Sequence, residues 1–219
     1  MAWKGDSGAA FSGGSGQMAV MGELLHRKCN AAIPLVDVGT DVFAFREDRE
    51  EVARIQVKTE AGTWYKRGEG YRAKFGVPMK QLSRTDSPPL FYAFAVRLDN
   101  SWGSFIVISR AKLRELWNDG CGSENEKSGD LEMHIQFRPD EKSKRDEARK
   151  YRELTAVCGK FDLTDYINAW ETLPPLKTPV AIDSPVHAPA TLTEGGGHAP
   201  KPILAELQIG EIDREPPQA

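Results

Sequence analysis

Residues 39–60 read GTDVFAFREDREEVARIQVKTE, which is the pattern of two strands joined by a charged turn. Successive side chains of a strand point to opposite faces of the sheet. Gln56 and Lys58 therefore lie on one face of the second strand, and Asp41 begins one face of the first. Because residues 46–51 form the hairpin turn, Asp41 is predicted to meet Gln56 and Lys58 across the strand pair.

The opposite face of the second strand is apolar, since Ile55 and Val57 alternate with the polar residues. A strand with one face in the core normally turns its other face to water. Here the second face carries the amide of Gln56 and the ammonium of Lys58, and the carboxylate of Asp41 is expected beside them near one end of the sheet. The sequence therefore predicts a polar site at this place.

The rest of the chain supplies further strands and helices around this hairpin. Apolar spacing and turn residues predict helices and strands in alternation. Together they predict an α/β fold, with a central mixed sheet flanked by helices. The expected strands are 32–35, 41–46, 52–59, 90–98, 103–110 and 131–139, and residues 61–78 are expected to form a loop that runs into a further strand. The expected helices are 17–30, 110–117, 142–153 and 163–173.

Composition divides the chain into three parts. Residues 1–15 are rich in Gly and Ser and are expected to be flexible. Residues 16–173 are expected to form one domain, and residues 174–219 a Pro- and Gly-rich disordered tail. Within the tail, residues 201–212 (KPILAELQIGEI) place apolar side chains at helical spacing. This segment either docks on a partner or on the protein's own body, or is a stray apolar cluster in a linker.

The bulk composition excludes several classes of protein. The chain is 40% hydrophobic and 28% charged, as in ordinary globular proteins, and no apolar run approaches the roughly 20 residues that span a bilayer. Three widely spaced cysteines argue for a reducing cytoplasm and against a disulfide framework. The net charge of −3 arises in the tail, so a nucleic-acid surface must be a local patch on a neutral body.

Four short motifs occur in order on the expected elements: GELL (22–25) on the first helix, IP (33–34), DVGTD (37–41) and QVKT (56–59). In this order they resemble the PD-(D/E)XK nuclease superfamily, and more closely its branches similar to Holliday-junction resolvases and homing endonucleases. The resemblance covers about residues 17–117. It implies a restriction-endonuclease-like α-β-β-β-α-β core. The chain departs from the family pattern at Gln56, where the usual residue is Asp or Glu.

The resemblance implies a metal site for phosphodiester hydrolysis. Mg²⁺, for which Mn²⁺ can substitute, takes hard oxygen ligands, polarises a phosphoryl oxygen and lowers the pKa of a bound water. The implied ligands are the carboxylate of Asp41, the amide oxygen of Gln56 and the backbone carbonyl of Val57. Glu23 is expected to bind the metal or its waters, and Asp37 to lie in the outer shell.

Lys58 is expected to orient or deprotonate the attacking water and to offset phosphate charge. Each of these residues also has a plain structural interpretation. Glu23 can form a helical ion pair with Arg27, Asp41 can cap a turn, and Gln56 and Lys58 can be a solvated strand edge. These interpretations stay open at the level of single residues, while the four motifs in order favour the site.

Residues 64–75 follow the strand that carries Gln56 and Lys58. Their composition predicts a contact with phosphates. The cations of this segment are Lys66, Arg67, Arg72 and Lys74, and they alternate with aromatic residues. Cations in such a segment can contact a nucleic-acid backbone while the aromatic rings stack on bases. The alternative is that the rings are core residues and the cations only keep the surface soluble.

The predicted function is therefore a Mg²⁺-dependent endonuclease acting on DNA, in restriction, phage defence, recombination or repair. The partner is expected to be double-stranded or branched DNA. A homodimer is compatible with cutting two strands, and the tail can recruit a protein partner. The alternative is a catalytically silent domain of the same superfamily that binds nucleic acid or scaffolds a complex.

Overall fold

The computed structural model describes residues 7–36, 39–65, 70–85, 88–99, 101–139 and 154–177. These residues belong to one compact unit, Met1–Val180, and a second unit, Ala181–Ala219, lies wholly outside the described residues. The elements are α1 (Ser7–His26), β1 (Asn30–Ala32), β2 (Val42–Phe45), β3 (Val52–Ala61), β4 (Thr63–Trp64), β5 (Tyr71–Pro78), α2 (Met79–Leu82), β6 (Leu90–Leu98), β7 (Ser101–Ser109), α3 (Arg110–Asn118), β8 (Ser123–Asn125), β9 (Asp130–Pro139), β10 (Leu154–Cys158), β11 (Phe161–Asp162), and the 3-10 turns η2 (Thr164–Tyr166), η3 (Trp170–Thr172) and η4 (Pro174–Leu176).

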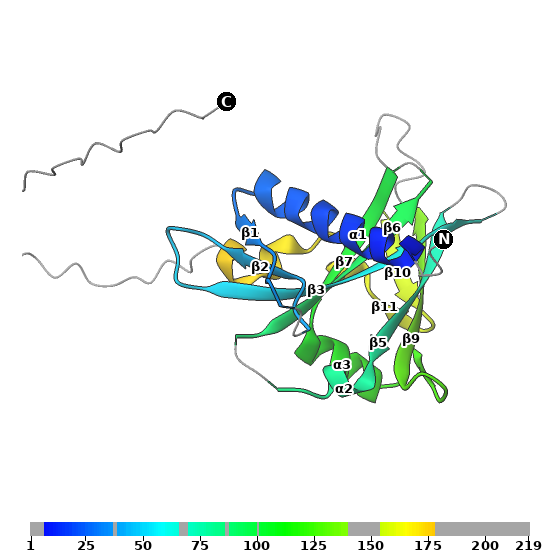
Figure 1. Ribbon diagram of the computed structural model, residues 1–219. Coiled ribbons are helices and arrows are strands. Elements are labelled where there is room, and N and C mark those ends of the chain that lie inside the picture. Colours follow the sequence, from blue (N-terminus) through cyan, green and yellow to red (C-terminus); the bar gives the residue numbers. More distant parts are fainter. Residues whose placement is uncertain are drawn as a thin grey trace, which may run out of the picture. The chain divides into compact units, whose positions relative to one another are not determined.

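A five-stranded mixed sheet forms the centre of the fold, with strand order β1-β2-β3-β6-β7 (Figure 1). The β3–β6 pair is parallel, whereas β1–β2, β2–β3 and β6–β7 are antiparallel. The predicted α/β class with a central mixed sheet is confirmed. The predicted hairpin register is also observed, because Val42 pairs with Ile55 and Phe43 with Arg54.

Strand β6, an inner strand of this sheet, is buried on both faces, which explains its almost unbroken apolar sequence LFYAFAV. Phe91, Ala93 and Ala95 belong to one hydrophobic core, and the residues that alternate with them belong to a second core. The sheet therefore separates two cores, one on each side. Its two faces are covered by different parts of the chain.

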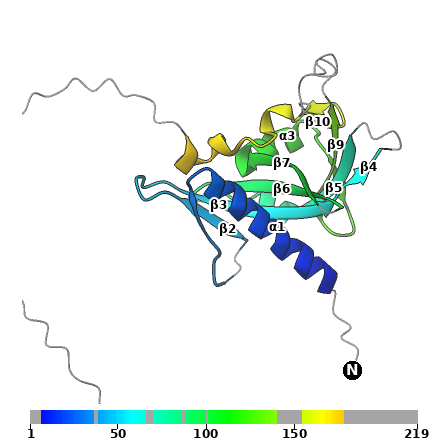
Figure 2. The same cartoon turned by 90° about the horizontal axis from the view of Figure 1, so that it is seen from above.

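Helix α1 covers the first face, lying across β2, β3 and β6 (Figures 1 and 2). Val20 and Leu24 of the helix are fully buried against Ile55 and its neighbours. The helix begins at Ser7, within the segment 1–15 for which composition predicts flexibility. The Gly16 backbone approaches the Thr59 side chain so closely that a Cβ on residue 16 would overlap it. Packing on the sheet therefore stabilises a helix in a segment whose Gly and Ser residues have low helix propensity.

A second sheet, which was not predicted from the sequence, covers the other face. Its path is β11-β10-β9-β5-β4, with β8 paired to β9. The apolar residues of β5 and β9 alternate and pack against β6 and β7, and Leu82 of α2 and Leu113 of α3 join the same core. The connection from β3 to β6 thus contains β4, β5 and the one-turn helix α2, instead of the single helix that the resemblance implies.

The predicted helix 163–173 is wrong, because the chain forms separate 3-10 turns there. Asn168 has a positive φ of 51°, which interrupts a helix. Its backbone N–H donates to Phe105 O at 2.8 Å, and its side-chain oxygen accepts from Phe105 N at 3.0 Å. Pairing with β7 therefore replaces the helical hydrogen bonds in this segment.

The described part of the chain extends to residue 177, and so includes the first four residues of the predicted tail. Pro175 is buried in η4, and Leu176 packs on the core beneath α1. The predicted polar helix 142–153 and the tail motif 201–212 lie outside the described residues. No helix in the described part of the chain is long and apolar enough to cross a bilayer.

We expect Gly70→Ala to destabilise the fold by about 1–3 kcal/mol or more, measured by chemical denaturation. Gly70 has a φ of 114°, and an added Cβ would overlap Phe137 O in the neighbouring strand β9. The matched control is Gly159→Ala, since Gly159 has a φ of 60° but nothing within 4 Å of the added Cβ. Its expected cost is only about 1 kcal/mol. Equal costs for the two variants would contradict close packing at Gly70.

Candidate metal and phosphate site

Asp41 lies one residue before β2 and is held at the edge of β3. Its backbone N–H donates to Ile55 O at 2.9 Å, which extends the hairpin register by one step. Its carboxylate Oδ2 accepts hydrogen bonds from Val57 N at 2.7 Å and from the Gln56 side-chain amide. Asp41 and Gln56 are each only 8% exposed. The structure thus brings together Asp41, Gln56 and Val57.

This contact lies where β3 loses its partner. Strand β2 pairs with β3 only as far as Ile55. The N–H and C=O groups of one strand residue point toward the same neighbouring strand. Because Val57 N–H is directed at Asp41, Val57 C=O points to the same open edge. A backbone carbonyl and a carboxylate therefore share this edge.

Gln56 is held from its other side by Gln81 of α2. Gln81 Nε2 donates to Gln56 Oε1 at 2.8 Å and to Gly39 O at 3.3 Å, and the Tyr92 hydroxyl donates to Gln81 Oε1 at 3.4 Å. Gly39 has a φ of 84°, and a Cβ there would lie 3.0 Å from Gln81 Nε2. Burial raises the pKa of Tyr92 well above its ordinary value, so this hydroxyl stays protonated and can donate.

Lys58 lies on the same face of β3 as Gln56, as predicted from alternation. It is half-buried and pairs in register with Phe94 of β6. The next residue on this face is Glu60, whose pKa is raised by burial and lowered less strongly by Lys74 and Lys58. Lys58 therefore stands between the Asp41–Gln56 contact and a second polar region farther along β3.

Glu23 lies on α1, which packs on the Ile55–Val57 face of the sheet and not on the face that carries Gln56 and Lys58. Its carboxylate forms an ion pair with Arg27 at 2.7 Å, the structural interpretation that the sequence left open. Asp37, the predicted outer-shell residue, lies outside the described residues. The roles of Glu23 and Asp37 toward a metal stay predictions.

The groups at the edge of β3 match a hard divalent cation by their chemistry. A carboxylate, an amide oxygen and a backbone carbonyl are all oxygen donors of the kind that Mg²⁺ takes together with retained waters. In the described conformation Gln56 turns its amide nitrogen toward Asp41, so a half-turn of the amide would be needed to present Oε1. Across the described ranges, no three His, Cys, Asp or Glu side chains gather closely enough to hold a metal. Any such site there depends on Gln56 and the backbone.

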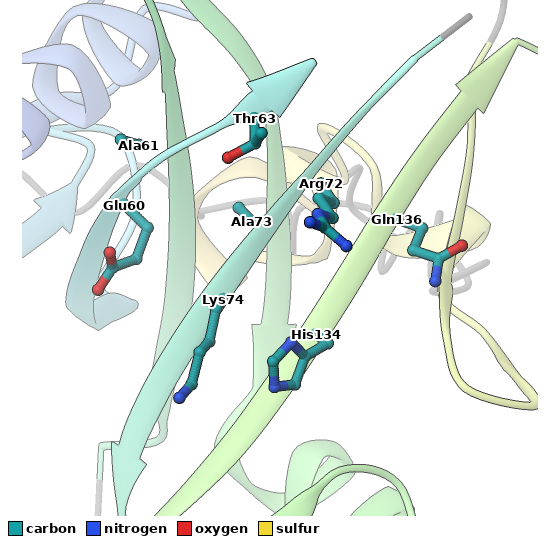
Figure 3. Close-up of a pocket in the computed structure, with 8 residues that line it drawn as sticks. All are labelled: Glu60, Ala61, Thr63, Arg72, Ala73, Lys74, His134 and Gln136. Atoms are coloured by element: carbon teal, nitrogen blue, oxygen red, sulfur yellow. The ribbon is translucent and has the colours of Figure 1, made fainter. Parts of the chain in front are cut away.

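A cavity of about 400 Å³ opens farther along β3, between this strand and the second sheet (Figure 3). Figure 3 shows Lys74 of β5 beside His134 of β9, with which it pairs in register, and Glu60 across from them. Arg72 and Lys74, two of the predicted phosphate-binding cations, line this cavity and are exposed. Lys74 also forms an ion pair with Glu132 at 2.8 Å.

Tyr71 and Phe75 of the segment 64–75 are core residues, as in the alternative interpretation, whereas Trp64 is 48% exposed. Tyr71 and Phe75 are 3% and 0% exposed and point to the inner side of the second sheet. Lys66 and Arg67 lie outside the described residues. The predicted cationic segment is thus, where described, the outer face of β5.

No family model matches this chain. A search of characterised proteins also finds no match. Among solved structures, the bacterial homing endonuclease I-Ssp6803I is similar with a TM-score of 0.40 and 14% sequence identity, over 74% of this chain and 87% of that chain. A similarity of this degree does not assign an activity to this protein.

Three residues near the Asp41–Gln56 contact were not predicted from the sequence: Gln81, Arg54 and Arg110. Gln81 occurs in a four-residue helix that carries no periodic signal. Arg54 lies two residues before Gln56 on the same face of β3, and its Nε donates to Thr40 Oγ1 at 3.0 Å. Arg110 begins α3 and is 5% exposed, and only the packing of α3 on α2 brings it close.

Proposed function

We propose that the protein is a metal-dependent endonuclease that hydrolyses DNA phosphodiester bonds. The observation that supports this most directly is the edge of β3, where the buried Asp41 carboxylate lies beside Val57 and Gln56 with Lys58 next on the same face. A buried carboxylate on a polar strand face, next to an ammonium, is costly as a structural device. Such groups are typical of sites that bind and activate.

Mg²⁺ would be held by Asp41, by the Val57 carbonyl and, after rotation of its amide, by Gln56, and Mn²⁺ would replace it. When bound, the ion polarises a phosphoryl oxygen and lowers the pKa of a water. Val57 N–H keeps Asp41 oriented through its 2.7 Å hydrogen bond. The 2.8 Å hydrogen bond from Gln81 Nε2 to Gln56 Oε1 holds the amide in the described orientation, so the rotation requires the Gln81 amide to turn as well.

Lys58 would act on the attacking water and on the phosphate. Lys58 is half-buried and pairs in register with Phe94 of β6. A partly desolvated ammonium is a stronger electrostatic partner for a phosphate oxygen than a fully hydrated one. It can also hold a water in line with the phosphorus atom.

The exposed cations of β5 would extend the contact along the DNA backbone. Arg72 and Lys74 lie on the outer face of the second sheet, beside the cavity that begins at Glu60. Glu132 neutralises Lys74 in part, so Arg72 is the stronger candidate for a phosphate contact. A homodimer, and a protein partner bound through the tail, remain proposals from the sequence alone.

A second candidate is a silent domain that binds nucleic acid without cutting it. The observation that favours it is the donor set itself, since Gln56 contributes no charge and its amide nitrogen faces Asp41. One carboxylate binds Mg²⁺ less tightly than two or three. The two candidates differ only in cleavage and metal binding, so they can be separated by experiment.

The test is cleavage of a panel of supercoiled plasmid, linear duplex, single strand, four-way junction and RNA, with Mg²⁺ or Mn²⁺. We expect metal-dependent cutting of a DNA substrate and a rate at least about 100-fold lower for Lys58→Ala, as for loss of one transition-state donor. The matched control is Lys160→Ala, because Lys160 is an exposed lysine in the β10–β11 turn. Its rate should equal the wild-type rate. Binding without cutting of any substrate would instead favour the silent domain.

A further inference from the structure

Two of the three cysteines lie beside each other in the core between the two sheets. Cys121 follows α3 and Cys158 ends β10, and both belong to the core that the second sheet covers. Their thiols share a hydrogen bond. Cys29 belongs to the other core, on the far face of the central sheet. Within one folded chain, Cys121 and Cys158 are therefore the two cysteines that can react with each other.

The thiol of Cys158 occupies a break in the strand pairing of β9. Along one edge of this strand, β8 pairs as far as Glu132 and β10 begins to pair at Ile135. In the described part of the chain, the two residues between them have no strand partner on this edge. The backbone N–H groups of His134 and Gly122 donate to the Cys158 sulfur instead. The sulfur thus takes the place of a backbone carbonyl acceptor.

The loop that carries Cys121 is held against this break by its backbone. Gly120 and Gly122 flank Cys121 with φ angles of 95° and 84°, a conformation that favours glycine. A Cβ on Gly122 would come within 2.7 Å of Glu132 O in β9. Cys121 N donates to Leu116 O at 2.8 Å, which closes the end of α3. The backbone therefore fixes where the Cys121 thiol meets Cys158.

These hydrogen bonds make the cysteines chemically unequal. The hydrogen bond from Cys121 lowers the pKa of Cys158, burial opposes this, and the two backbone N–H groups lower the pKa further. The same hydrogen bond and burial raise the pKa of Cys121. Burial also raises the pKa of Cys29, whose sulfur donates to the carbonyls of Asn30 and Phe45. Because the thiolate is the nucleophilic form of cysteine, Cys158 is the most reactive of the three by its surroundings.

A cavity of about 310 Å³ gives small molecules access to Cys158, which lines it. Gly120 and Gly159 also line this cavity, and a Cβ on either would meet no described atom within 4 Å. The side chains beside the thiol therefore leave an opening. One water takes up about 30 Å³ in the liquid, so hydrogen peroxide, which is one oxygen larger, fits with room to spare.

We propose that Cys158 and Cys121 form a peroxide-reactive dithiol site that closes to a disulfide. The Cys158 thiolate attacks one oxygen of hydrogen peroxide, the O–O bond breaks, and the leaving hydroxide takes up the proton that Cys158 released. Cys158 is then a sulfenic acid. The Cys121 sulfur attacks the Cys158 sulfur, the S–O bond breaks, and the hydroxide leaves with the Cys121 proton as a second water. The two sulfurs lose two electrons, which the peroxide gains, and a dithiol reductant reverses the change by exchange.

The test is oxidation of the folded, full-length protein by hydrogen peroxide, followed by a count of free thiols in denaturant and a peptide map. We expect two of the three thiols to be lost and to return with dithiothreitol. The map should link the peptide of Cys121 to that of Cys158, in a monomer lighter by two hydrogen atoms. Full retention of the thiols, a linkage that includes Cys29, or disulfides between chains as the main product would overturn the inference.

Two variants separate the roles of the two thiols. Cys121→Ser should leave Cys158 as a sulfenic acid that dimedone traps, and Cys158→Ser should give neither this adduct nor a disulfide. The matched control is Cys29→Ser, which makes the same substitution in the other core and should form the disulfide as the wild type does. A dimedone adduct on Cys121 in Cys158→Ser, as abundant as that on Cys158 in Cys121→Ser, would overturn the assignment of Cys158 as the attacking thiol.

The wild-type peptide map needs no variant, so it decides the inference even where a serine variant does not fold. The dithiol site is also independent of the proposed endonuclease. Oxidation is measured without nucleic acid or metal, and the cleavage panel is measured with the thiols reduced. Failure of one proposal therefore leaves the other standing.

Discussion

Asp41→Asn is expected to remove both metal-dependent cleavage and metal-dependent stabilisation. The variant keeps an oxygen that can accept from Val57 N, so the edge of β3 should stay folded. It loses the one carboxylate in the proposed ligand set. A bound metal supplies several kcal/mol of transition-state stabilisation, and a loss of about 4 kcal/mol lowers the rate about 1,000-fold.

Two measurements check this expectation. The first is the cleavage rate on whichever substrate the wild-type protein cuts. The second is the melting temperature with and without Mg²⁺, since a ligand at 100 times its dissociation constant stabilises a protein by about 2.7 kcal/mol. Wild-type protein should show the shift and Asp41→Asn should not.

The matched control for Asp41→Asn is Asp48→Asn. Asp48 is an exposed carboxylate in the hairpin turn, paired with Arg46, which lowers its pKa. The change of side chain is the same, but the position lies away from the proposed ligands. A metal-dependent shift that survives in Asp41→Asn would show that the metal binds elsewhere.

Phe94→Ala is expected to cost about 3 to 5 kcal/mol of unfolding free energy. Phe94 is fully buried between the two sheets, with its ring centroid 5.0 Å from that of Phe75 and 5.8 Å from that of Tyr92. The mutation leaves a cavity that the two opposed sheets cannot easily close. Chemical denaturation gives the measurement.

The control for this variant is Phe11→Ala, because Phe11 is 79% exposed. Its expected effect lies within about 0.5 kcal/mol. A cost below about 1 kcal/mol for Phe94→Ala would contradict the close packing of the two sheets. Since Lys58 pairs in register with Phe94, cleavage by the variant would also report how far the core positions that lysine.

The central sheet could be predicted because its strands carry strong local patterns. Alternation in 52–58 identified which side chains of β3 share a face, and the contact between Asp41 and Gln56 follows from it. Alternation does not show which other part of the protein packs on each face of the strand. The apolar residues of β5 and β9 indicated buried strands, but their assembly into a second sheet depends on contacts between distant segments.

Only the part of the site that lies on a single hairpin could be predicted from the sequence. Asp41, Gln56 and Val57 lie on one hairpin, so their proximity follows from register. Gln81 and Arg110 reach the same place through α2 and α3, whose packing no local pattern encodes. Glu23 illustrates the converse, since its spacing from Arg27 predicts an ion pair and the structure contains that pair.

The chain alternates between the two layers: β1–β3 build the first sheet, β4 and β5 the second, β6 and β7 the first again, and β8–β11 complete the second. During synthesis β5 therefore leaves the ribosome long before β9, its main partner. Until then β5 has only the two-residue strand β4 beside it, and most of its length, with Phe75 and Val77 on its apolar side, stays unpaired. Such an unpaired strand is a site of aggregation, so a nascent chain of this protein would be a natural client for chaperones.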